Sequence, residues 1–450
     1  MTKFPQIDRV SADDLMSLVL EGQTSPMVGA MLVLDTHAGL DPAYFISTLH
    51  TRLSAVPRLK QRLEKVPLGC GRPIWIDDAG FQIADHISII RCPAPGNREA
   101  ALGVAAKLLT TRLPRNRALW VAALVTDMQE GQSALIFAYH HALADGMGGL
   151  AVLASIADGA PVLSSPVLLS PRPTRTQLRV DAIRDNLVAL RGFPATLVRT
   201  VQALRQVAPF LRTRLAPSSL NRPTSPAKRF VTVACDFADL HTAAHAEGAT
   251  TNDAVLCAVT GALSYLLAER GETLETLVVS VPVSLRRRNA QGHDTAQELG
   301  NQTSVRLLRL PAVGDPQMRL RSVADASRVA KRIPPDAFNS LLHPAFRLLA
   351  RLGLFQWFIN HQHVNHTFVS SLRGPQRAIT MGGFPVLDIM ALSTSSGNVT
   401  VSFTALSYAS RLTITLNADP QTCADLDRLR ALLKGELDAL MVNTRLPEPL

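Results

Sequence analysis

Apolar runs separated by short polar stretches divide the first third of the chain into alternating strands and helices. Residues 28–34 and 120–125 are apolar runs of strand length, and residues 43–53 and 98–113 have the spacing of helices. Residues 134–139, Ala-Leu-Ile-Phe-Ala-Tyr, are apolar at every position, which is typical of a central strand buried on both faces. This alternation predicts an α/β fold.

The predicted strand at residues 134–139 leads directly into two adjacent histidines, His140 and His141. A loop follows, and then a predicted helix at residues 147–153. Because successive residues of a strand point to opposite faces, the two imidazoles are not expected to serve one ligand. We therefore expect one histidine to point into the core and the other into a cleft.

The pattern changes between residues 161 and 226, where Ser and Pro mark both ends of a connector. Two amphipathic helices are predicted within it, with apolar positions Val180, Ile183, Leu187 and Leu190, then Leu197, Val201, Leu204 and Ala208. The basic positions between them are Arg179, Arg184, Arg191, Arg199 and Arg205. Two interpretations stay open: linker helices packed on the neighbouring domains, or helices lying on a membrane or lipid droplet.

The second half resumes the α/β pattern. Strands are predicted at residues 230–237, at 277–283 and at several places between 367 and 417, and helices at 251–270, 316–332 and 422–441, the first with Thr251 as N-cap. The expected domains are residues 1–165, a basic amphipathic connector at 166–227, and residues 228–450.

Composition supports two globular domains. A chain of 450 residues is too long for one compact core, and 47% hydrophobic with 18% charged residues excludes wholesale disorder. Aromatic residues make up only 5%, with three Trp, which argues against a protein that stacks nucleobases.

Cysteine usage and hydropathy bear on the compartment. The five cysteines are widely spaced and form no CxxC pair, so a zinc ribbon or disulfide framework is not expected and a reducing compartment fits. We see neither the apolar core of a signal peptide at the N-terminus nor an uninterrupted apolar run of about 18 residues. A cytoplasmic protein is expected, with room for one that lies on a membrane.

The net charge of +10 is concentrated in one segment. Between Pro171 and Phe230, eleven Arg and one Lys face only two acidic residues, so this segment carries the whole excess. Such a basic block indicates nucleic acid, anionic lipid or a phosphorylated cofactor as partner.

The chemistry of the chain centres on His140-His141-x-x-x-Asp145-Gly146. A histidine can take the proton of a hydroxyl and later return it, whereas Asp145 could orient the ring or support the loop through a cation. The alternatives are a metal site, which adjacent strand histidines serve poorly, and a pair of structural core histidines. A dinucleotide fingerprint is excluded because its glycines would follow the strand directly.

This motif resembles the signature of the condensation-domain and chloramphenicol-acetyltransferase-like superfamily. Further blocks resemble the bacterial wax ester synthase/diacylglycerol acyltransferase family, in the expected order. They are Val10–Asp14 with Pro26–Ala30, Trp75 with Asp85-His86-Ile87, Leu113–Trp120, Asn252-Asp253, Val281–Arg286, Gly300–Ser304, Arg373-Gly374-Pro375 and Ser407-Tyr408. The resemblance spans roughly residues 10–440. Two blocks depart from it, at Ala118, where the family has Pro, and at Ser370–Pro375, which replaces Ser-Asn-Val-Pro-Gly-Pro.

The resemblance implies two chloramphenicol-acetyltransferase-like domains with the active site in the cleft or tunnel between them. It implies a long-chain acyl-CoA:alcohol O-acyltransferase that forms triacylglycerol, wax esters or both, without an acyl-enzyme. His141 would be the general base, Asp145 a structural or orienting residue paired with an arginine such as Arg286, and His140 structural. Motif-supporting positions would be Gly146, Asn252, Asp253, Arg286 and Asn301.

Acyl-CoA is then expected as co-substrate, with diacylglycerol or a fatty alcohol as acceptor and with no bound cofactor, metal or nucleic acid. A peripheral position on a membrane or lipid droplet is expected, and the oligomeric state stays open. Two other functions remain: a condensation-type acyltransferase that uses a carrier-bound donor on polyketide or glycolipid hydroxyls, and a non-catalytic lipid-binding protein.

Three further polar groups have structural interpretations. His361, His363 and His366 are expected in an exposed loop rather than at a metal, and His241 and His245 on a solvated helix face. The pair Asn252-Asp253 is explained by helix capping.

Overall fold

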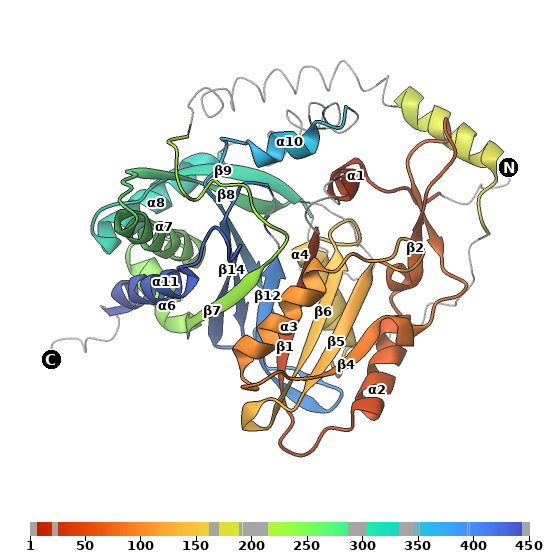
Figure 1. Ribbon diagram of the computed structural model, residues 1–450, viewed down its shortest axis with the longest axis horizontal. Coiled ribbons are helices and arrows are strands. Elements are labelled where there is room, and N and C mark those ends of the chain that lie inside the picture. Colours follow the sequence, from red (N-terminus) through yellow and green to blue (C-terminus); the bar gives the residue numbers. More distant parts are fainter. Residues whose placement is uncertain are drawn as a thin grey trace.

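The computed structural model describes residues 7–19, 26–161, 171–188, 215–286, 303–332, 352–393 and 397–442, together with positions 191, 346, 349 and 395. Figure 1 shows two sheet-containing units side by side, each with helices packed on its sheet.

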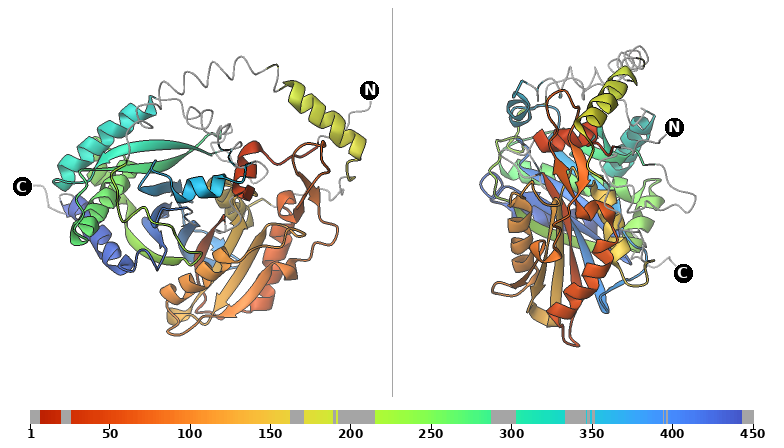
Figure 2. Two further views of the ribbon diagram at one scale, coloured as in Figure 1. Left: turned by 45° about the horizontal axis from the view of Figure 1, so that its top comes forward. Right: turned by 90° about the vertical axis from the view of Figure 1, so that its right-hand side faces the viewer.

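The first unit is built on a six-stranded sheet in which only β4 and β5 run parallel. Its order is β11 (Thr380–Met381), β12 (Phe384–Ser393), β1 (Met27–Asp35), β6 (Gln132–His140), β5 (Trp120–Thr126) and β4 (Ile87–Arg91). Helices lie on both of its faces in the side view of Figure 2: α2 (Pro42–Ser54), α3 (Arg98–Thr110) and α4 (Gly146–Ile156). This double cover explains why every residue of β6 is buried.

The second unit has a mixed six-stranded sheet in which β10 runs parallel to both of its neighbours. Its order is β7 (Arg229–Asp236), β14 (Arg411–Ala418), β13 (Val401–Tyr408), β10 (Thr367–Arg373), β8 (Thr276–Ser284) and β9 (Thr303–Pro311). The helices of this unit are α6 (Phe237–Ala246), α7 (Thr251–Glu269), α8 (Pro316–Lys331) and α11 (Leu426–Met441). Alternate residues of β13, such as Val401 and Phe403, join the core shared with these helices.

Smaller elements border the two units. They are α1 (Ala12–Val19), the hairpin of β2 (Gln61–Glu64) and β3 (Ile74–Asp77), and α10 (Phe355–Asn360). The mixed α/β architecture with two sheet-rich units agrees with the fold class predicted from the sequence.

The strand β12 joins the first sheet although it lies far along the chain. It pairs antiparallel with β1, for example Ala30 with Ala391. Its buried Asp388 lies 3.4 Å from Arg98 of α3 and 3.5 Å from Arg411 of β14, so this carboxylate ties the two units together. A division of the chain at residues 165 and 228 does not account for β11 and β12, because β1 needs a hydrogen-bonding partner on its second edge.

Most element boundaries shift slightly from the expected ones for local reasons. The N-cap of α7 is Thr250 rather than Thr251, because Thr250 and Asp253 form a reciprocal capping box. The strand predicted at residues 230–237 ends at Asp236, which caps α6, so Phe237 is helical. Helix α11 starts at Leu426 instead of residue 422.

One helix of the described residues, α7, is long and apolar enough to cross a membrane by length and composition. Of its most apolar stretch, 72% is buried inside the second unit, where it contacts α8 and α11. Burial of this kind is what a core helix of a globular domain shows.

The connector is helical over residues 175–188. The predicted apolar stripe of this helix is not packed on a domain: Val180, Ile183 and Leu187 are exposed, whereas Leu178 and Ala182 are buried. The second predicted helix, with Leu197, Val201, Leu204, Ala208, Arg199 and Arg205, lies outside the described residues, as does Leu190.

Candidate active site

The two histidines of the motif lie where β6 ends. His140 is the last residue of the strand and pairs with Met27 of β1, and the N–H of His141 donates to the carbonyl of Pro26 at 2.8 Å. The chain then turns through residues 141–143 and enters α4. The strand ladder thus fixes the backbone of both histidines, although only His140 belongs to the strand itself.

His140 is a buried, structural residue. Its Nδ1 accepts a hydrogen bond of 3.0 Å from the N–H of Ala142, which stabilises the turn. Burial, with smaller contributions from the positive charges of Arg115 and His141, lowers the pKa of His140 to about 3. The ring is therefore neutral at physiological pH, with its proton on Nε2.

His141 lies in a different environment one residue later. The residue is half-buried, and its Nδ1 is buried without a hydrogen-bond partner among the described residues. Among the described residues no carboxylate is hydrogen-bonded to this ring, unlike the histidine of a Ser-His-Asp triad. Of the two imidazoles, His141 is the one not used to hold the turn.

Asp145 anchors the motif rather than orienting a histidine. It is the N-cap of α4, and its Oδ1 accepts from the N–H of Gly148 at 2.8 Å. The same oxygen lies 2.9 Å from Nη2 of Arg286, and Oδ2 accepts from the Thr303 hydroxyl at 3.0 Å. The ion pair expected between Asp145 and Arg286 is therefore present.

These contacts place the motif at the junction of the two units. Arg286 follows β8 directly and Thr303 opens β9, so both partners of Asp145 come from the second sheet. Gly146 also faces the second unit, because a side chain there would meet Leu372 of β10 at 3.4 Å. The motif thus contacts the second unit through Asp145 and Gly146.

Tight packing holds the start of α4 against β6. The hydroxyl of Tyr139 donates to the carbonyl of Asp145 at 3.1 Å, and the N–H of Gly149 donates to the same oxygen at 2.9 Å. A Cβ at Gly149 would come within 1.7 Å of the Tyr139 hydroxyl. Burial raises the pKa of Tyr139, so this phenol remains a donor.

The remaining predicted positions lie elsewhere. Asp253 caps α7 together with Thr250: its carboxylate accepts from the N–H and the hydroxyl of Thr250, and its own N–H donates to that hydroxyl. Asn252 belongs to the same first turn. Asn301 lies outside the described residues. The contact of Thr303 with Asp145 was not predicted from the sequence. Thr303 lies two positions after Asn301 in the same sequence block, and its hydroxyl could have marked it as a partner for a carboxylate.

The other histidine groups have structural roles or none that concerns catalysis. His86 stacks on Trp120 at 4.5 Å and its Nδ1 lies 2.9 Å from the Trp120 carbonyl, which explains its conspicuous sequence block. His361 and His363 are exposed as expected. His366 is instead buried, and its Nδ1 accepts a hydrogen bond from the N–H of Val278 in β8. No group of three or more metal-binding side chains occurs in the described part of the chain.

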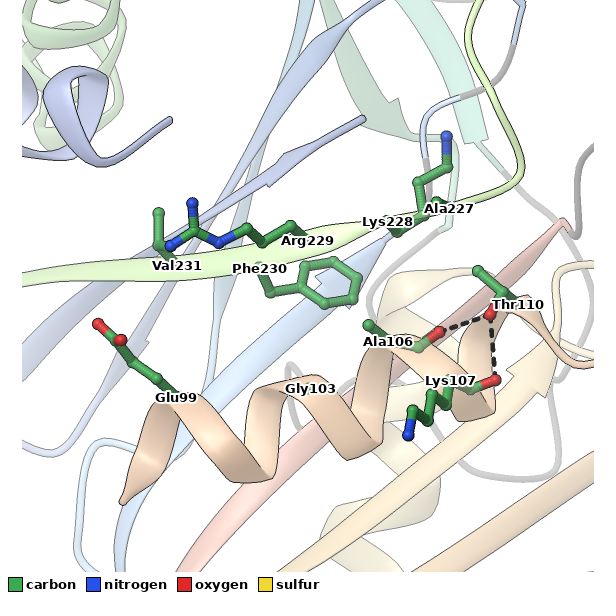
Figure 3. A pocket seen from close by; sticks show the side chains of 10 residues that line it. All are labelled: Glu99, Gly103, Ala106, Lys107, Thr110, Ala227, Lys228, Arg229, Phe230 and Val231. Carbon is green, nitrogen blue, oxygen red and sulfur yellow. Dashed lines mark hydrogen bonds between the residues drawn. The ribbon is translucent and has the colours of Figure 1, made fainter. Parts of the chain in front are cut away.

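A groove of about 390 Å³ separates α3 from β7 (Figure 3). Its walls are the backbone and small side chains of α3 on one side and the start of β7, including Phe230, on the other. Charged side chains surround it: Glu99, Lys107, Lys228 and Arg229. Neither histidine of the motif lines this groove.

Two family models match the sequence. The model described as the wax ester synthase/diacylglycerol acyltransferase catalytic domain matches residues 10–255, and the C-terminal domain model of the same family matches residues 299–441. Together they cover most of the chain.

Curated relatives agree over nearly the full length. A Mycobacterium bovis protein with the provisional name of a diacylglycerol O-acyltransferase is 29% identical over 425 residues, 91% of this chain and 90% of its own. A Mycobacterium tuberculosis protein, named in the same provisional way, is 27% identical over 458 residues, 93% of this chain and 87% of its own.

Solved structures share the fold. The wax ester synthase/diacylglycerol acyltransferase of Marinobacter aquaeolei superposes with a TM-score of 0.71 at 20% identity over 98% of this chain and 100% of that one. The starter condensation domain of rhizomide synthetase, in complex with C8-CoA, gives 0.63 at 15% identity over 97% and 94%. By its sequence and by its fold, the chain belongs to the wax ester synthase/diacylglycerol acyltransferase family of acyltransferases.

Proposed function

We propose that the protein transfers a long-chain acyl group from acyl-CoA to an alcohol, with His141 as general base. The observation that carries this proposal is the division of labour in the motif. Asp145 is committed to Arg286 and Thr303, and His140 is neutral and holds the turn. Only His141 combines partial exposure with an imidazole free of hydrogen bonds from the described residues.

The reaction requires one proton to move twice. The imidazole of His141 takes the proton of the acceptor hydroxyl as the oxygen forms a bond to the thioester carbonyl carbon. The tetrahedral intermediate then expels the CoA sulfur as the C–S bond breaks, and the imidazolium returns the proton to the thiolate. The ester and free CoA leave. A thioester is already activated, so no acyl-enzyme is needed.

The names of the relatives support a choice of acceptor and donor. The Mycobacterium relatives are named for diacylglycerol, and the Marinobacter structure for both wax esters and diacylglycerol. We infer acyl-CoA as co-substrate and diacylglycerol, a fatty alcohol or both as acceptors. Since these acceptors reside in lipid phases, we infer a cytoplasmic protein that works at the surface of a membrane or lipid droplet.

Labelled palmitoyl-CoA, offered with diacylglycerol or with hexadecanol, tests the proposal. The purified protein should form labelled triacylglycerol or wax ester, and His141→Ala should lose nearly all product while keeping its circular dichroism spectrum. His363→Ala, at an exposed histidine, is the matched control and should retain activity. Undiminished turnover by His141→Ala would refute the mechanism. Product only from a carrier-bound donor would favour the condensation-type alternative.

A further inference from the structure

The helix of residues 175–188 separates its charges between two faces. The residues that face the body of the protein include Leu178, Asp181, Ala182 and Asp185, spaced three and four apart as on one side of a helix. Its opposite side carries no acidic residue, and the side chains exposed there are those of Thr176, Val180, Ile183, Arg184, Leu187 and, one turn on, Arg191. Both acidic residues are thus withdrawn from the outer face.

The inner face is docked by specific contacts. Arg9 lies 2.6 Å from Asp181 and donates a second hydrogen bond of 2.9 Å to the carbonyl of Leu178. Arg72 lies 3.5 Å from Asp185. Leu178 packs beside Cys70 and Ile74 in a small apolar cluster. These contacts fix the orientation of the helix, so its outer face points to solvent.

The outer face exposes large apolar side chains to an unusual degree. The exposed fractions are 60% for Val180, 59% for Ile183 and 51% for Leu187, and the adjacent Val188 is exposed by 63%. Scattered single apolar residues are normal on a protein surface, but Val180, Ile183 and Leu187 share one helix face and form a patch. Arg184 and Arg191 lie within this patch, where their long stems can follow an apolar phase while the guanidinium reaches its polar boundary.

A second apolar group lies along the same edge of the molecule. Leu352, Leu354 and Trp357, at the start of α10, are exposed by 61%, 47% and 62%. Figure 1 and the right-hand view of Figure 2 place α10 and the helix of residues 175–188 on the upper edge. With Leu68, these segments hold eight of the sixteen large exposed apolar residues in the described chain.

We propose that this edge, the outer face of residues 175–188 together with the start of α10, is the surface by which the protein binds an anionic phospholipid layer. Charge complementarity selects this partner, because the outer face has arginines and no acid. Aliphatic side chains with basic neighbours are the composition of a helix lying in a lipid interface. Binding at this edge would hold the protein at the layer in which its acceptors reside; that benefit, though not the binding, rests on the proposed function.

Vesicle flotation with the full chain tests this surface. Vesicles of phosphatidylcholine alone are compared with vesicles that also contain phosphatidylglycerol. Ile183→Gln with Leu187→Gln should reduce binding about tenfold, and Arg184→Gln with Arg191→Gln should remove the preference for the anionic vesicles. The matched control is Met318→Gln with Val329→Gln, two equally exposed apolar residues of α8, which should bind as the parent protein does.

Two further measurements separate the outcomes. Light scattering reports the oligomeric state, and loss of a dimer in the Ile183/Leu187 variant without loss of flotation would show that a second copy covers this face. Turnover of a water-soluble short-chain alcohol should be unchanged in this variant, whereas turnover of diacylglycerol in vesicles should fall. Unchanged flotation refutes the surface, while flotation without any ester product refutes only the proposed function.

Discussion

Arg286 and Asp145 form an ion pair of 2.9 Å between the two units, and both side chains are almost completely buried, at 1% and 2% exposure. The carboxylate is also the N-cap of the helix that follows the two histidines. One residue therefore sets the start of α4, the turn after His141 and the docking of the second sheet. A change in the relative position of the units would therefore move Asp145 and the turn that contains His141.

Removing one partner of this pair should be costly. Arg286→Met removes this buried charge partner of the Asp145 carboxylate, and the expected loss is roughly 3–5 kcal/mol of unfolding free energy. The double variant with Asp145→Asn should lose less than the sum of the two single variants, because neither charge is then left alone. Urea denaturation at neutral pH measures all three.

An exposed ion pair provides the comparison. Lys434 and Asp438 are paired on the surface of α11, and both are about half-exposed. Lys434→Met should cost no more than about 1 kcal/mol, since solvent screens the pair. Equal losses in Arg286→Met and Lys434→Met would contradict the structural role assigned to Asp145.

The buried His140 should make stability depend on pH. Its pKa is about 3 in the folded protein and ordinarily 6.5, so between these values the unfolded chain binds a proton that the folded chain does not. Its contribution to stability is complete above about pH 6.5 and falls by about 1.4 kcal/mol per pH unit as the pH drops toward 3.

The variant His140→Asn isolates this effect. Its Oδ1 can accept the hydrogen bond that the Ala142 N–H now gives to Nδ1, and it does not titrate. Urea midpoints measured between pH 7 and pH 4.5 should decline less steeply in the variant than in the parent protein. Parallel declines would mean that His140 is protonated without penalty.

Gly149 should tolerate no side chain. A Cβ there would overlap the Tyr139 hydroxyl, and Gly149→Ala is expected to cost roughly 1–3 kcal/mol. Tyr139→Phe combined with Gly149→Ala should recover part of that loss. Gly103 on α3 is the matched control, since nothing lies within 4 Å of its Cβ position, and Gly103→Ala should stabilise the protein by about 0.8 kcal/mol. Thermal unfolding ranks the four proteins.

The residues Thr250 and Asp253 should affect folding and not turnover. Each contributes a side-chain hydrogen bond to the capping box of α7, so Thr250→Ala and Asp253→Ala should each cost about 1 kcal/mol. Acyl transfer per folded molecule should stay within about twofold of the parent value. A selective collapse of turnover in Asp253→Ala would assign it to the reaction instead.

The sequence predicted best those elements that depend on neighbouring residues along the chain. The all-apolar strand before His140 and the capping sequence of α7 predicted their elements because periodicity and capping are local properties. The Asp145–Arg286 pair was expected from the resemblance alone. Spacing offers no route to it, since the two residues are 141 positions apart.

Tertiary packing decided what local pattern could not. The apolar stripe at Val180 and Ile183 left open whether the helix packs on the domains or lies on a membrane. The helix is docked through Arg9 and Asp181, a contact between distant segments that no periodicity reveals. The pairing of β12 with β1 could not be predicted from the sequence either, because many apolar segments of the chain could serve as the neighbour of β1.

That partnership has a consequence for how the chain is made. The residues that complete the second edge of β1, Phe384–Ser393, emerge from the ribosome only after the whole stretch of chain that separates them from β1 has been synthesised. Until then the nascent chain carries an open, strongly apolar strand edge, the kind that invites pairing with other chains. We expect the first unit to need protection during translation, and a truncated product ending at residue 165 to aggregate.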